Sequence, residues 1–137
     1  MAVTATAKGV SMSPRKVGIV AGLVRGHSVA DALVILQNTP RRSALPVKKA
    51  IESARANADH NHNYKPDTLN IISITVTPGP RTKRFRPAAH GRALPFQRKS
   101  SHIHVVVDGE QRTAKKPAKA AVKDPLRSEE RRVGKEC

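Results

Sequence analysis

The feature that most limits how this 137-residue chain can fold is a basic segment joining two predicted strands. Residues 69–77 and 101–107 alternate apolar and polar side chains, as half-buried strands do. Their connection, residues 78–100, is far longer than the few residues that a compact hairpin needs. Residues 68–107 contain no Asp or Glu, so the cations of the connection lack a local counter-charge. We do not expect such a segment to pack into a core.

We interpret residues 78–101 as an extended hairpin arm. Two limbs of about ten residues reach about 35 Å at about 3.3 Å per residue. Gly91 can supply a positive φ at the tip, whereas Pro80, Pro87 and Pro95 are expected to stiffen the limbs and to block regular strand pairing. Ordering each residue without a core costs about 1–2 kcal/mol, which only an external surface can offset. We expect that surface to be RNA, contacted by Arg81, Lys83, Arg84, Arg86, Arg92, Arg98 and Lys99.

The overall charge also indicates a polyanionic partner. Lys and Arg total 26 against 10 acidic residues, which leaves a net charge of +16. The longest apolar stretch, residues 17–24, is far too short to span a membrane, so no membrane partner is expected. The N-terminus lacks a secretory signal pattern, which favours a cytosolic protein. With Tyr64, Phe85 and Phe96 as the only aromatic residues, contact with the nucleic-acid backbone is favoured over base stacking.

Two helices are predicted in the N-terminal third. Ser13 provides a hydroxyl N-cap ahead of Pro14, and apolar residues then recur at helical spacing until Gly26. Ser28, with Asp31 three residues later, opens a second, short helix in the manner of a capping box. Residues 1–11 carry a weak alternation that suits a short edge strand.

A third helix has two alternative starts. If Thr39 is its cap, Pro46 lies past the first turn and kinks the helix, whereas Pro46 is tolerated if the cap is Ser43. We expect an irregular first turn. The helix is expected to end within residues 57–63, where Asp, His and Asn cluster.

The C-terminal part divides into two pieces beyond a single domain expected over residues 1–110. Residues 111–126 are rich in Ala, Lys and Pro without an apolar face, which predicts a disordered basic tail. Residues 127–137 (RSEERRVGKEC) correspond to one reading frame of an adapter used in short-read DNA sequencing. Our hypothesis is that they are adapter read-through, the alternative being a genuine charged helix. Resequencing the source locus distinguishes the two, and removing the segment still leaves a net charge of +15.

No catalytic, metal or cofactor site is expected. Paired carboxylates, a nucleophile with its base, and a phosphate-binding glycine loop are all absent at recognisable spacing. His60 with His62, and His102 with His104, stand two apart, which is a weak metal signal. Histidines that lie near RNA or cap a turn are the more typical explanation. Asp59 beside His60 is better explained as a polar helix terminus than as a catalytic dyad.

Basic pairs stand at the starts of two predicted helices. Arg15 and Lys16 lie in the first turn of the first helix, and Arg41 and Arg42 lie near the start of the third. Backbone N–H groups point outwards at such positions and can receive phosphates. We expect RNA contacts there, although a solvated charged face explains any single one of these side chains almost as well.

Several motifs resemble the bacterial-type L-twenty-two family of large-subunit ribosomal proteins over roughly residues 5–108. The first two helices match at residues 13–17 (SPRKV), 25–26 (RG) and 28–33 (SVADAL). Residues 56–62 (ANADHNH) are similar to the family's ending of the third helix. The arm and return strand match at residues 79–80 (GP), 83–84 (KR), 86–87 (RP), 91–93 (GRA) and 101–103 (SHI).

The resemblance implies an α+β fold, with three helices packed on a small antiparallel three-stranded sheet and a long extended β-hairpin arm. It implies binding to large-subunit rRNA by the globular part, Arg25 included, beside neighbouring ribosomal proteins. The arm would thread through the rRNA, line the peptide exit tunnel and aid subunit assembly. Its tip would meet the nascent polypeptide and the macrolide region. By position, that tip would hold Lys83, Arg84, Arg86, His90 and Arg92.

One departure from the family and one competing function remain. Residues 94–97 (LPFQ) replace an Asp-Arg-Ile-like continuation, so we expect the returning limb to make one phosphate contact fewer and to pair differently. The alternative function is a free nucleic-acid-binding protein, either an RNA chaperone or a DNA-compacting factor, which acts by counterion release.

Overall fold

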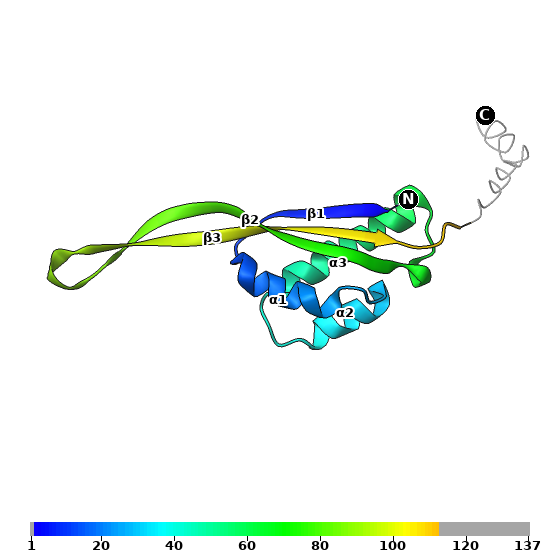
Figure 1. Ribbon diagram of the computed structural model, residues 1–137, viewed down its shortest axis with the longest axis horizontal. Helices are drawn as coiled ribbons and strands as arrows, with labels where there is room; N and C mark the ends of the chain where they lie inside the picture. The colour runs from blue at the N-terminus through cyan, green and yellow to red at the C-terminus, as the bar shows by residue number, and fades with distance from the viewer. Residues whose placement is uncertain (1, 113–137) are drawn as a thin grey trace, which may run out of the picture.

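Three helices and three strands make up residues 2–112, the part of the chain that the computed structural model describes (Figure 1). Of the predicted tail, residues 111–126, the first two are part of the domain: Gln111 bridges to Tyr64, and the Arg112 N–H donates to the Asn63 carbonyl at 2.7 Å. The rest of that tail and the suspected adapter segment lie outside the described residues. The elements are β1 (Val3–Val10), α1 (Pro14–Val24), α2 (Val29–Asn38), α3 (Ala44–His62), a 3-10 turn η1 (Pro66–Thr68), β2 (Asn70–Pro87), a second 3-10 turn η2 (Ala89–Gly91) and β3 (Ala93–Asp108). This is the expected α+β fold.

The strands form one antiparallel sheet in the order β1-β3-β2. The expected edge strand is therefore β1, which pairs with the central strand from Val3 opposite Val107 to Val10 opposite Ser101. Figure 1 shows the helices gathered on one side of the sheet, while β2 and β3 continue together well beyond them as the arm. The arm is thus an extension of the two strands rather than an inserted loop.

The helix boundaries follow the local signals. Pro14 occupies the first turn of α1, although the Ser13 side chain makes no capping bond. At α2 the Ser28 hydroxyl accepts the Asp31 N–H at 3.1 Å, as the capping pattern predicts. Ser43 immediately precedes α3, so the second of the two alternative starts is correct and Pro46 is tolerated in the first turn. No helix in residues 2–112 is long and apolar enough to cross a membrane.

The core lies between the helices and one face of the sheet. α1 packs against β2, and α3 packs against β1 and β3. Valines of α1 and Ile51 of α3 are fully buried, as are the alternating β3 residues Ile103, Val105 and Val107. Each such side chain contributes about 1.5–3 kcal/mol through burial. In β3 the burial stops at Ser101, so the core ends where the arm begins.

The expectation that prolines would block regular pairing in the arm is wrong for Pro87 and Pro95, whereas Pro80 does lie where the register is interrupted. Residues 81–87 pair with residues 93–99 without a break, including the LPFQ segment. Phe85 faces Pro95, and Pro87 faces Ala93. Directly opposed residues of an antiparallel pair alternate between hydrogen-bonded and non-hydrogen-bonded pairs. These two pairs are two residues apart along the strand, so both are of the same kind. The next pair outwards is hydrogen-bonded, since the Ala88 N–H donates to the Arg92 carbonyl at 2.8 Å. Both prolines therefore stand where an N–H would point away from the partner strand.

Two special backbone features set the ends of the arm. At the tip, His90 and Gly91 have φ values of 55° and 67°, so the positive φ predicted for Gly91 is confirmed and His90 shares it. At the root, the register shifts between Pro78 and Arg81, which leaves Gly79 and Pro80 as a bulge. The Ser100 hydroxyl donates to the Pro80 carbonyl at 2.6 Å across this bulge.

Candidate nucleic-acid interface

The paired arm carries its cations on both faces. Because side chains alternate along a strand and directly opposed residues share a face, Arg81, Lys83 and Lys99 lie on one face. Arg84, Arg86 and Arg98 lie on the other face. Residues 81–87 and 89–99 are all exposed. The arm is therefore cationic on each side rather than along one stripe.

These cations have no acidic partners within residues 2–112. The ion pairs of the described chain join Lys48 to Glu52, Lys65 to Glu110 and Arg112 to Asp59, all outside the arm. The Arg84 guanidinium donates only to the carbonyl of the adjacent Lys83, at 3.0 Å. The arm thus offers a row of uncompensated positive charges, as the composition predicted.

Apolar side chains lie among the cations of the second arm face. Phe96 and Leu94 are exposed there, at 43% and 56%. The Arg86 guanidinium carbon lies 5.6 Å from the centre of the Phe96 ring, within cation–π distance. This contact places the Arg86 guanidinium over a side chain of the opposite strand.

The residues expected at the tip are spread along the distal arm. His90 lies in the tip turn η2, and Arg92 is the first residue after that turn. Arg86 pairs with Leu94 close to the turn, whereas Lys83 pairs with Gln97 nearer the root. Only part of that group can therefore meet a ligand at the end of the arm.

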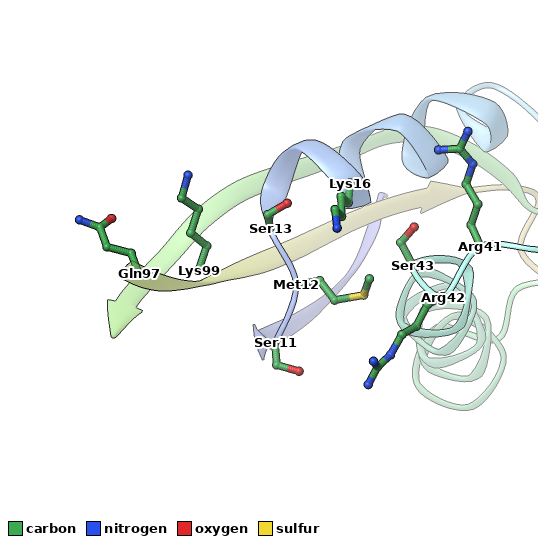
Figure 2. A pocket seen from close by; sticks show the side chains of 9 residues that line it. All are labelled: Ser11, Met12, Ser13, Lys16, Arg41, Arg42, Ser43, Gln97 and Lys99. Carbon is green, nitrogen blue, oxygen red and sulfur yellow. The ribbon is translucent and has the colours of Figure 1, made fainter. Parts of the chain in front are cut away.

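A pocket of about 590 Å³ lies beside the root of the arm (Figure 2). It is bounded by the β1–α1 connection, the first turn of α1, the segment before α3 and the returning arm strand. Its lining combines four cations with small polar side chains and one methionine: Ser11, Met12, Ser13, Lys16, Arg41, Arg42, Ser43, Gln97 and Lys99. The structure therefore brings the two predicted basic pairs into proximity through Lys16, Arg41 and Arg42, and adds an arm residue.

Ser43 is the pocket residue most removed from solvent. It is 4% exposed as a residue, yet its hydroxyl makes no capping bond to α3. Figure 2 shows it between Arg41 and Arg42 at one end of the pocket, with Gln97 and Lys99 at the other end. The site thus contains a hydroxyl donor that the helix cap does not use.

A second, smaller pocket has a volume of about 230 Å³ and is lined by Arg15, the one member of the two basic pairs that does not line the larger pocket. Arg15 lines it together with Arg81 and Lys99 of the arm root. Lys99 lines both pockets, so the two form one basic zone around the point where the arm leaves the sheet. We call the residues that line the two pockets the root zone.

Arg25 stands apart from this zone. Its guanidinium donates to the Ile74 carbonyl of β2 at 2.9 Å, in a partly buried position. The bond ties the end of α1 to the sheet. A structural role therefore accounts for Arg25, and neither of the two pockets includes it.

The histidines singled out from the sequence take part in other contacts. The Gly9 N–H donates to Nδ1 of His102 at 2.9 Å, and His104 lies 3.1 Å from the Thr6 hydroxyl. Asp59 pairs with Arg112 at 3.2 Å. Within residues 2–112 no group of three potential ligands could hold a metal ion.

Sequence reasoning did not assign to a binding site several residues of the root zone that carry polar or polarisable groups, among them Ser43, Met12 and Gln97. Ser43 was considered only as a helix cap, while Met12 and Gln97 were not singled out as site residues. Their roles depend on the meeting of the β1–α1 connection, the start of α3 and the arm, which are far apart in the chain. Without the register of β3, no local signal identifies them.

Comparison with known proteins identifies the family of this chain. The family model described as ribosomal protein L22p/L17e matches residues 5–108. The chain belongs to this family. A relative from Clostridioides difficile, named large ribosomal subunit protein uL22, is 49% identical over 78% of this chain and 96% of its own length. A protein of the same name from Herpetosiphon aurantiacus is 48% identical over 71% of this chain and 86% of its own.

Family membership confirms the resemblance drawn from the helix and arm motifs. A third relative with the same name, from Lacticaseibacillus casei, is 45% identical over 76% of this chain and 89% of its own length. The matched span contains the helices, the arm and all the cations of the root zone. The interface described above therefore belongs to a ribosomal protein.

Proposed function

We propose that this chain is a structural constituent of the large ribosomal subunit, held on large-subunit rRNA by the root zone and the arm. The observation that carries the proposal is the presence of three cations on each face of the paired arm. A segment that lies on the surface of an RNA needs one basic face. A segment with two basic faces is best neutralised when polyanion surrounds it.

The energetics of the arm favour the same environment. Phe85 is 72% exposed, and the side chains of the paired limbs contribute nothing to the core. An isolated two-stranded hairpin is marginally stable in water. Contacts with RNA on both sides would supply the stabilisation that the arm lacks in the free protein, so we place it between rRNA segments.

The length of the arm suits a role in assembly of the large subunit. Because an arm of about 35 Å separates its tip from the root zone, one chain can contact rRNA segments that are far apart and hold them together during subunit assembly. Neighbouring ribosomal proteins would contact the globular part. The protein would act in the cytoplasm, within the ribosome, as a binding component that needs no catalytic group.

We assign the distal arm to the wall of the peptide exit tunnel. The exposed residues Arg86, His90 and Arg92 would line that wall near the end of the arm. A nascent polypeptide, and macrolides that bind in the same region, would then pass close to these side chains. The matching arm motifs and family membership support this assignment.

Shortening the arm tests the proposal. Residues 83–97 are removed, and the paired residues Thr82 and Arg98 are joined by an Asn-Gly turn. The core ends at Ser101 and the helices lie outside the deletion, so we expect the helical circular dichroism signal to be retained and the unfolding midpoint to stay within a few degrees of the original. In cells that carry only this variant, we expect slower accumulation of large subunits and a several-fold change in macrolide sensitivity.

A full-length control replaces His90 with Asn, a residue that also tolerates the positive φ of this position. Its subunit assembly should match that of the original chain. Unfolding of the shortened protein would refute the independence of arm and core, and normal assembly with unchanged macrolide response would refute the role of the arm. Absence of the full chain from purified large subunits would favour a free RNA chaperone or DNA-compacting factor.

A further inference from the structure

We propose that the larger root-zone pocket binds a single extruded RNA nucleotide, its phosphate at the Ser43 end and its base over Met12 towards Gln97. The inference rests on the proposed function, because it names the part of the RNA that this pocket would receive. It goes beyond phosphate contact, since it assigns the pocket a complete nucleotide.

The phosphate end of the pocket is defined by charge and by an unused donor. Lys16, Arg41 and Arg42 contribute cations, and none of the nine lining residues is acidic. Ser43 is 4% exposed as a residue and lines the pocket, and its hydroxyl makes no capping bond to α3. A hydroxyl in this position can donate a charge-assisted hydrogen bond to a phosphate oxygen. The start of α3, which follows Ser43 directly, adds the favourable end of a helix dipole.

The rest of the pocket suits a base. Met12 is half-buried, packs against the core and presents a polarisable thioether in the middle of the pocket (Figure 2). Gln97 provides an amide that both donates and accepts, which is what the edge of a base requires. Its backbone is fixed by pairing with Lys83. The pocket therefore has a cationic end at Ser43, an apolar middle at Met12, and a far end where the Gln97 amide lies beside the ammonium group of Lys99.

The size of the pocket favours a nucleotide over a bare phosphate. At about 590 Å³ it falls within the range of about 300–1,000 Å³ that is usual for small-molecule sites. Duplex RNA keeps its bases stacked inside the helix, so its backbone alone could reach Ser43 and would leave Met12 and Gln97 without a ligand. Proteins commonly read RNA at such unstacked positions, where the bases can be splayed out.

The test uses the full chain labelled with ¹⁵N and with ¹³C at the methionine methyl groups. Adenosine and uridine 5′-monophosphates, ribose 5-phosphate and inorganic phosphate are titrated separately by NMR. We expect the nucleotides to shift the Met12 methyl and the Ser43 amide, and to bind several-fold more tightly than ribose 5-phosphate. Ser43→Ala should weaken nucleotide binding on the order of ten-fold, the value of one hydrogen bond to a charged group.

A matched control, Lys49→Gln, removes an exposed cation of α3 outside the pocket and should leave nucleotide binding unchanged. Met12→Ala should weaken the nucleotides but not inorganic phosphate. Equal affinities for all four probes, or shifts that avoid Met12, would overturn the nucleotide site. Incorporation of the chain into large subunits is measured in parallel, because failure to incorporate would refute the proposed function whatever the titrations show.

Discussion

Ser101 is the one residue of the described core whose chemistry does not suit its surroundings. It is fully buried in β3 between Val10 and Pro78, and its hydroxyl has no hydrogen-bond partner within residues 2–112. Leaving a buried hydroxyl unpaired costs about 1–3 kcal/mol. The residue stands next to the bulge at the arm root, where the core gives way to the arm.

Ser101→Ala should therefore stabilise the protein by about 1 kcal/mol, because the substitution removes the unpaired group and leaves only a small void. Urea unfolding of the isolated chain measures the effect. Ser11→Ala, at an exposed serine near the same end of the sheet, should change the free energy of unfolding by less than about 0.5 kcal/mol. A loss of stability in Ser101→Ala would mean that the hydroxyl has a bonding role.

For single residues, the sequence predicted the positions of charged side chains better than the contacts that those side chains make. The basic pairs at the helix starts were predicted to contact RNA, because helix N-termini and cations are both visible locally, but their meeting at one pocket was not predicted. The bond from Arg25 to the Ile74 carbonyl was not foreseeable, since it depends on the packing of α1 against β2. For the same reason, a serine that precedes a helix shows no local sign of lining a pocket.

The bulge at Gly79 and Pro80 is the element that joins the arm to the sheet. A Cβ on Gly79 would lie 2.6 Å from the Ser100 hydroxyl oxygen and 3.2 Å from Nε2 of His102. Ser100 cannot simply rotate away, because its hydroxyl holds the Pro80 carbonyl. Glycine is therefore required here because Ser100 lies so close to its Cα, and not because the backbone has a positive φ.

Gly79→Ala should destabilise the protein by about 1 kcal/mol, through loss of the bond between Ser100 and Pro80. In a Ser100→Ala background the oxygen is absent, so the same substitution should cost clearly less. Thermal unfolding of the two single variants and the double variant measures this coupling. Additive effects would show that the crowding at Gly79 is relieved in another way.

The elements themselves were largely predictable, because caps, periodicity and alternation act over short distances. The starts of α1 and α2 and the alternation of buried and exposed residues in the core strands follow such signals. The pairing of the arm was mispredicted, because the effect of a proline depends on which way its missing N–H would have pointed. That direction is fixed by the register of Pro95 and Pro87 with their partners, which the sequence does not display.

Considered as a whole, the molecule concentrates uncompensated charge at one end. Within residues 2–112, the arm and the root zone carry a concentration of cations without acidic partners, while the opposite end of the sheet holds Lys65 and Arg112 in ion pairs with acidic residues. This polarity was predictable in part, since the absence of acids from residues 68–107 is visible in the sequence. The meeting of the arm root with the helix starts required the three-dimensional fold.

The two faces of the arm should contribute similarly to rRNA binding. Replacing Arg81, Lys83 and Lys99 with Gln, or instead Arg84, Arg86 and Arg98, should reduce the slope of log K against log salt concentration. The expected reduction is about 0.7–0.9 for each phosphate that the variant no longer neutralises. Binding of the full chain to large-subunit rRNA across a salt series measures it.

A variant with Lys65→Gln and Arg112→Gln serves as the control, because these cations are already paired with Glu110 and Asp59. It should change the salt slope little. If only one triple variant altered the slope, the arm would lie on a single RNA surface, and the enclosed position proposed above would be wrong.

The strand order has a consequence for how the chain is made. The central strand, β3, is the last of the three to be synthesised, and both β1 and β2 depend on it for every ladder bond they make in the core. Val3, for example, has no strand partner until Val107 has been synthesised. During translation the three helices can form early, but the part of their apolar surface that packs against β3 stays uncovered until residues 101–108 emerge. Sequence separations of this size slow folding. We therefore expect the nascent chain to pass through a stage in which its helices are formed, apolar surface is exposed, and other molecules are needed to prevent aggregation.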